Sequence, residues 1–291
     1  MRIGITIVFN GLHHLKHNEW ADKLTSMLDY WAIVDGLAAN TGSTSWCNQL
    51  FAVPSVGRLL EGSLDGTNEY LDMAIAKYPG SVGAVALTGA RHNKDSMMNV
   101  GVDMVHQEFG PTLGKAPPAP SGPHFLWQLD VDEQWTPEQM DAAEQELLAS
   151  GGTCGCFHAD HYVGEHLLAR GTWGEGNDPV DPLRNAYRRL WLWDGRKFAT
   201  HEPPVLEGGN GKEVLLLQKP DQPASLGSRF AHYAYFYEKD VEFKEQFYSG
   251  HEGLLSRWKA LQARPKEDFP RPLSDLITGP WGKTKTEVVW L

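Results

Sequence analysis

The feature that most constrains this chain is the alternation of short apolar runs with amphipathic segments over residues 1–150. The apolar runs have strand character and lie at 2–9, 31–34, 81–87 and 125–129. The amphipathic segments repeat their apolar residues at helical spacing and lie at 18–30, 66–78, 93–109 and 136–150. Strands that alternate with helices predict βαβ units, so we expect an α/β fold with a mostly parallel, twisted sheet flanked by helices.

The helix expected at 136–150 has the clearest boundaries. Thr136 can cap its first turn, Pro137 suits the first helical position, and Gln139 completes a capping box. Gly151 and Gly152 then end the helix.

The second half of the chain follows a different pattern. Short strand-like pieces are separated by irregular segments, at 153–158, 187–193, 214–218 and 230–235. A final helix is expected from about Val241 to Leu261. We therefore expect a nucleotide-binding α/β half followed by an irregular C-terminal half that shares its sheet.

Composition excludes some classes of protein. The formal net charge of −11 argues against nonspecific nucleic-acid binding, which needs Lys and Arg to displace counterions from phosphates. No apolar stretch approaches the ~20 residues that a transmembrane helix needs, and the N-terminus does not have the pattern of a signal peptide. Three cysteines are too few for a disulfide framework, which favours the cytoplasm, and Cys154 and Cys156 are expected to be buried thiols in a strand.

The strongest chemical signal follows the run at 125–129, where Asp130, Asp132 and Glu133 come in quick succession. Alternation places Asp130 and Asp132 on the same side of the chain. Such carboxylates repel one another unless a positive charge lies beside them, and a divalent cation that also binds a ligand's phosphates would supply it. Ligands of open α/β sheets bind outside the carboxyl ends of the strands, which is where this segment falls. The structural alternative is an acidic turn that complements the dipole of the following helix.

A set of short motifs occurs in a fixed order between residues 3 and 133. The motifs are Ile3–Gly11, Val34–Gly36, Gly62–Thr67, Lys94 with Asn99, and Asp130–Glu133. In type and order they resemble the GT-A glycosyltransferases, especially those of family 2. The resemblance implies a single GT-A-like, Rossmann-like domain over 1–291. Residues 1–135 would form its nucleotide-sugar-binding half, and 136–291 its acceptor-side half with the C-terminal helix.

The resemblance also implies roles for individual residues. Asp35 would contact the nucleoside of the donor, while Asp130 and Asp132 would hold its ribose and its metal-bound diphosphate. Asp65 would contact the donor too, but residues 37–61 separate it from Asp35, which is unusual for the family, so Asp65 with Gly66 is alternatively only a turn before the next helix. Lys94 would neutralise donor phosphate, or it is a solvated surface lysine.

Candidates for the remaining roles lie in the second half. Some GT-A enzymes supply a late histidine as a metal ligand, and His232 resembles it; the structural alternative is a half-buried histidine bonded to backbone. An imidazole ligand favours Mn²⁺ over Mg²⁺. Glu202, which precedes two prolines, is the candidate general base for an inverting reaction, with Asp160 and Glu165 as competitors. For each of these three the ordinary alternative is a loop acid.

Together these features predict a glycosyltransferase that depends on Mn²⁺ or Mg²⁺ and uses a nucleotide sugar, with a UDP-sugar as the expected donor. Inversion at the anomeric carbon is the expected outcome. The acceptor stays open among a glycan, a lipid, a protein and a modified nucleobase. A sugar nucleotidyltransferase is one alternative, although the basic Gly-rich loop that such enzymes carry after the first strand is replaced here by Asn10–His14. A noncatalytic carbohydrate-binding protein is the other.

Overall fold

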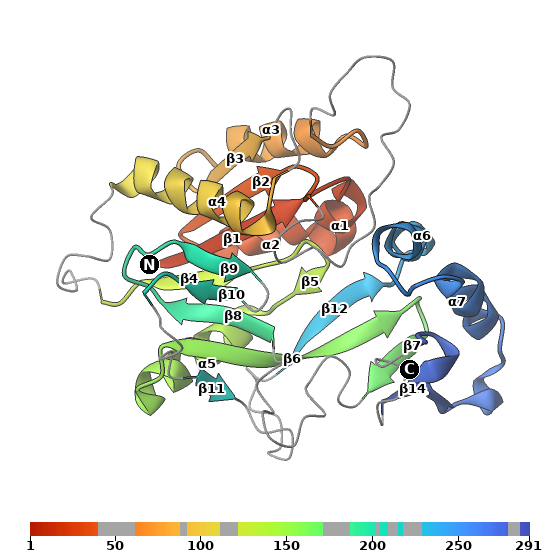
Figure 1. Cartoon of the computed structure of the whole chain (residues 1–291). Helices are drawn as coiled ribbons and strands as arrows, with labels where there is room; N and C mark the ends of the chain where they lie inside the picture. Colours follow the sequence, from red (N-terminus) through yellow and green to blue (C-terminus); the bar gives the residue numbers. More distant parts are fainter. Residues whose placement is uncertain are drawn as a thin grey trace.

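The computed structural model describes residues 1–39, 62–87, 92–110, 122–170, 187–201, 204–208, 215–217, 229–278 and 286–291. Its first half is built on four parallel strands in the order β3-β2-β1-β4. They are β1 (Arg2–Val8), β2 (Tyr30–Asp35), β3 (Val82–Ala86) and β4 (Phe125–Gln128). The parallel α/β arrangement expected from the sequence is therefore confirmed (Figure 1).

Helices cover both faces of these strands, which explains why the central strands are mostly apolar. All six residues of β2 are buried. On one face Trp31 and Ile33 share a core with α2 (Trp20–Met27), α3 (Thr67–Lys77) and α5 (Pro137–Ser150). On the other face Ala32 shares a core with α4 (Lys94–Phe109) and with the hairpin of β9 (Phe198–His201) and β10 (Pro204–Leu206). The short helices α1 (Leu12–Lys16) and η1 (His17–Glu19) connect β1 to α2.

The second half extends the same sheet with antiparallel strands. The order continues from β4 through β8, β6, β7, β14 and β13. Their bounds are β6 (Cys154–Val163), β7 (Leu167–Arg170), β8 (Tyr187–Leu192), β13 (Arg271–Pro272) and β14 (Glu287–Trp290). Three shorter strands join beside this path: β5 (Glu133–Gln134), β11 (Leu215–Leu217) and β12 (Arg229–Tyr235). The sheet is thus mixed, with a parallel centre.

The C-terminal helix predicted over 241–261 is two helices, α6 (Glu238–Phe247) and α7 (Leu254–Gln262). Gly250 and Gly253 between them have positive φ angles of 81° and 73°. These conformations suit glycine and interrupt the helical path. The one-turn helices η3 (Lys266–Asp268) and η4 (Leu273–Asp275) follow.

Three local expectations can be compared directly with the structure. Thr136 and Gln139 form the predicted capping box of α5, with both reciprocal hydrogen bonds present. Cys154 and Cys156 are buried thiols in β6, as expected. Within the described ranges, no helix combines the length and the apolar character needed to cross a bilayer.

Candidate functional site

The carboxyl ends of β1, β2 and β4 meet at one edge of the sheet. Val8 lies beside Asp35 across the β1–β2 pair, and Ile5 lies beside Gln128 across the β1–β4 pair. Because all three strands run in the same direction, Asp35 and the acidic segment after β4 emerge at the same edge. This is the edge at which open α/β sheets bind their ligands.

Asp35 is the last residue of β2 and is completely buried. The backbone N–H of Ser63 donates a hydrogen bond to its Oδ2 at 2.7 Å, and the Ser63 hydroxyl donates to its Oδ1. Burial raises the pKa of the Asp35 carboxyl, although the bonds from Ser63 act in the opposite direction. Asp35 therefore anchors the turn that begins at Ser63.

Asp65 forms the centre of that turn. Its Oδ1 accepts hydrogen bonds from the Thr67 backbone N–H at 3.1 Å and from the Thr67 hydroxyl at 2.6 Å. Its Oδ2 accepts a bond from the backbone N–H of Leu12 at 3.1 Å. An aspartate that bonds the backbone two residues on forms an Asx turn. The structure thus places Asp65 in the turn before α3, where it also fixes the start of α1.

The loop after β1 is bound to the same turn. Asn10 donates from its backbone N–H to the Ser63 hydroxyl at 2.6 Å, and Gly11 donates to the Thr67 hydroxyl at 3.1 Å. The Asn10 side chain in turn accepts a bond from the backbone of Leu64. The 62–67 turn therefore lies against β1 and β2, despite the long stretch of sequence that separates it from Asp35.

Arg189 binds two of the three carboxylates after β4. Its guanidinium makes a bidentate contact with Glu133, the shortest distance being 2.6 Å, and its Nη2 donates to Asp130 Oδ2 at 2.9 Å. The Glu133 side chain is fully buried, whereas that of Asp130 is 37% exposed. Burial raises the pKa of Glu133 to about 7, with Arg189 acting to lower it. Glu133 is thus part of the buried framework, and Asp130 is the accessible member of the pair.

Asp132 has a different partner, His232 of β12. Antiparallel pairing of β12 with β5 places His232 opposite Glu133, and His232 Nε2 lies 3.4 Å from Asp132 Oδ2. Both side chains are mostly buried, with 12% and 18% exposed. Burial acts to raise the pKa of Asp132, but the nearby His232, Lys244 and His14 outweigh it and hold this pKa well below its usual range. The structure therefore brings together the two residues that the sequence suggested as metal ligands.

Lys94 and His201, the residue that precedes Glu202, lie on the α4 side of β4. Lys94 is the half-buried first residue of α4. Burial lowers the pKa of His201, and the charge of Lys94 lowers it further. His201 Nε2 lies 3.2 Å from the side-chain nitrogen of Gln128, the last residue of β4. Glu202 itself lies outside the described residues.

The two competing acids lie elsewhere on β6 and its turn. Asp160 accepts a hydrogen bond from Arg229 Nε at 2.8 Å and is tied to that ion pair. Glu165 lies in the turn between β6 and β7, and its side chain is 78% exposed.

Sequence reasoning missed Arg189 as part of this site. The signal was present, because Arg188 and Arg189 interrupt a strand that is otherwise apolar and aromatic. A charged side chain that points into a core needs a partner, and three carboxylates were available after β4.

Comparisons with known proteins give a distant likeness. No family model and no curated protein sequence matches the chain. Among solved structures, S. aureus TarS 1–349 in complex with UDP is 11% identical with a TM-score of 0.40, over 92% of this chain and 68% of that one. The same protein in complex with UDP-GlcNAc is 11% identical with a TM-score of 0.36, over 66% of this chain. That match spans 45% of the TarS chain. At these values the likeness by itself assigns neither a family nor a function.

Proposed function

We propose that this protein is a metal-dependent glycosyltransferase that uses a nucleotide-sugar donor, with a UDP-sugar as the expected donor. The observation that carries the proposal is the meeting of Asp35, Asp130, Asp132 and His232 around the carboxyl edge of the parallel strands. Asp35 ends β2 and Asp130 follows β4, the two strands that flank β1, and they are the proposed nucleoside and ribose contacts. Asp132 and His232 add one carboxylate oxygen and one imidazole nitrogen at the same edge, as the proposed metal ligands.

The Asp132–His232 pair fits a divalent cation. Two ligand atoms at neighbouring octahedral positions around an ion, each bonded at about 2.1 Å, lie roughly 3.0 Å apart. Asp132 Oδ2 and His232 Nε2 are 3.4 Å apart. A mixed carboxylate and imidazole set suits Mn²⁺ better than Mg²⁺. When bound there, the cation would act as a Lewis acid for the departing nucleoside diphosphate.

The protein's own groups supply the remaining roles in this proposal. Asp130, held in place by Arg189, is accessible to a ribose hydroxyl. Lys94 at the start of α4 adds positive charge near Gln128 and His201. Glu202 follows His201 directly and is the proposed general base that takes the proton from the acceptor hydroxyl during inversion.

A specific contact pattern weighs against the sugar-nucleotidyltransferase alternative. Such enzymes use the loop after the first strand to bind phosphates through backbone amides. Here the amides of Asn10, Gly11 and Leu12 already donate to side chains of the 62–67 turn. The loop therefore serves as a structural contact, and of the two proposed metal ligands Asp132 follows β4 and His232 lies on β12.

The proposal is tested by donor hydrolysis with a panel of nucleotide sugars in the presence of Mn²⁺ or Mg²⁺. Asp132→Asn removes the charge and keeps the shape, so turnover should fall by about 10²–10³-fold, as it does when a group that stabilises transition-state charge is lost. Asp72→Asn, an exposed change on α3, is the matched control and should keep wild-type turnover. Wild-type turnover in Asp132→Asn, or activity that survives a chelator, would refute the metal role. Sugar binding with no turnover for any donor would favour the carbohydrate-binding alternative.

A further inference from the structure

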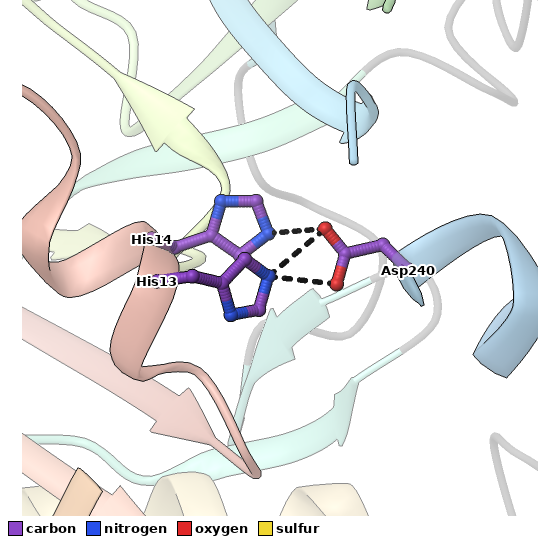
Figure 2. Close-up of side chains that lie close together, drawn as sticks. All are labelled: His13, His14 and Asp240. Atoms are coloured by element: carbon purple, nitrogen blue, oxygen red, sulfur yellow. Dashed lines mark hydrogen bonds and ion pairs between the residues drawn. The ribbon is translucent and has the colours of Figure 1, made fainter. Parts of the chain in front are cut away.

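A second group of potential metal ligands lies between α1 and α6, formed by His13, His14 and Asp240 (Figure 2). His13 Nε2 lies 2.8 Å from Asp240 Oδ1 and 3.1 Å from Oδ2. His14 Nε2 lies 2.9 Å from Oδ2. One ligand atom from each residue can be chosen so that all three lie within 4.8 Å of one another.

The two histidines converge although they are consecutive. Successive residues of an α-helix point about 100° apart, so a helix does not by itself direct both rings to one atom group. In α1 the ring centroids of His13 and His14 are only 4.2 Å apart, and both rings pack against Tyr237 in T-shaped arrangements. The three side chains are largely shielded, with 15%, 7% and 18% of their surfaces exposed for His13, His14 and Asp240. The cluster is therefore a defined, mostly dry arrangement.

We propose that His13, His14 and Asp240 bind a divalent transition-metal ion through two imidazole nitrogens and one carboxylate. With both rings neutral, the cluster carries one negative charge, which a divalent cation would more than neutralise. Two nitrogen ligands and one oxygen ligand favour Zn²⁺, Co²⁺, Ni²⁺ or Fe²⁺ over Mg²⁺ and Ca²⁺. Tetrahedral ligand atoms at about 2.0–2.1 Å from zinc lie roughly 3.3 Å apart, so the nitrogen–oxygen separations of 2.8 to 3.1 Å need to open only slightly. Three protein ligands leave a further position for water or a ligand oxygen.

The site would connect the two halves of the molecule. α1 follows β1 in the half that ends near residue 135, whereas α6 belongs to the C-terminal half and follows β12 (Figure 1). An ion held by both helices would stabilise the folded state, since the unfolded chain does not present these three ligands together. This site shares no residue with the Asp132–His232 pair, although His14 lies near enough to lower the pKa of Asp132, so variants of each group test the two sites separately.

The experiment uses the full chain, stripped with a chelator and then titrated with Co²⁺ or Zn²⁺ alone, without a nucleotide sugar. Visible absorption of Co²⁺ and calorimetry of Zn²⁺ report binding, and melting temperature reports stabilisation. His13→Gln, His14→Gln and Asp240→Asn should each weaken binding by about tenfold or more, because even loss of an outer-shell contact has this effect. The same changes should abolish the rise in melting temperature on adding Zn²⁺. Circular dichroism verifies that each variant is folded, and the two histidine variants keep the test decisive if Asp240→Asn does not fold.

His17→Gln is the matched control, because His17 contacts the same Tyr237 but its Nδ1 bonds the Tyr237 hydroxyl. It should bind Co²⁺ like the wild type. Asp132→Asn and His232→Ala should also keep this site. Co²⁺ binding that all three cluster variants retain, or binding lost only in Asp132→Asn and His232→Ala, would overturn the proposal. Absence of binding by the wild type would show that the cluster is a hydrogen-bonded ion pair.

Discussion

At the scale of single residues, the three acids after β4 have different partners, and Arg189 binds two of them. Three neighbouring carboxylates need positive charge beside them. The structure shows that the guanidinium of Arg189 serves Asp130 and Glu133, whereas Asp132 lies beside His232. The placement of the acids after β4 could be read from sequence. Their partner Arg189 could not be predicted from sequence. It comes from a strand more than fifty positions away, and the register of that strand depends on tertiary packing.

Removing the buried guanidinium should be costly. Arg189→Met leaves the fully buried Glu133 carboxylate without its partner, so we expect a loss of about 3–5 kcal/mol in the free energy of unfolding. Urea denaturation followed by circular dichroism measures it. The double variant Arg189→Met with Glu133→Gln should recover part of the loss, because no buried charge is then left unpaired at Glu133. A single variant within about 1 kcal/mol of the wild type would show that the pair is not a major stabilising contact.

At the scale of elements, helix boundaries set by residues within one turn were predicted well. Boundaries that depend on long-range packing were predicted poorly. The capping box placed the start of α5 correctly, because Thr136, Pro137 and Gln139 act within one turn. The C-terminal helix was predicted as one because its apolar spacing continues past Gly250 and Gly253. Whether such glycines interrupt a helix depends on the packing of α6 against α7, which periodicity does not report.

The cap of α5 gives a prediction at this scale. Thr136→Ala removes the hydroxyl that accepts the backbone N–H of Gln139 at 3.2 Å, so the protein should lose about 1 kcal/mol, within a range of 0.5–2. Thr136→Ser keeps the hydroxyl and should stay close to wild type. Thermal and urea unfolding of the two variants side by side provides the measurement. Equal stability of Ala and Ser at this position would contradict the contribution of the cap.

At the scale of the whole molecule, the parallel half was predictable and the antiparallel half was not. Strand–helix alternation indicates parallel neighbours, because a crossover helix returns the chain in the same direction. In the order β8-β6-β7-β14 only β6 and β7 are consecutive in sequence, whereas β8 and β14 come from more distant segments, so nothing local indicates where they join the sheet. The same limit applies to the 62–67 turn, which reaches Asp35 only through the fold. Asp35, Asp130, Asp132 and His232 were nevertheless chosen from sequence and are found around one edge of the sheet.

A variant of the proposed general base tests whether the two halves act together. The proposed donor site lies in the first half, whereas Glu202 comes from the second. His201 contacts Gln128 at the end of β4, and Glu202 is the next residue along the chain. Glu202→Gln keeps size and hydrogen bonding but cannot accept a proton, so acceptor transfer should fall by about 10²–10⁴-fold. Donor and Mn²⁺ binding, measured by calorimetry, should not change, because the residue is assigned to the acceptor side. Asp160→Asn and Glu165→Gln are the comparison variants: Asp160 is engaged by Arg229, and Glu165 is largely exposed. If transfer survives in Glu202→Gln and is lost in Asp160→Asn or Glu165→Gln, the residue changed in the inactive variant is the base. A product that NMR shows to have retained its anomeric configuration would remove the need for such a base.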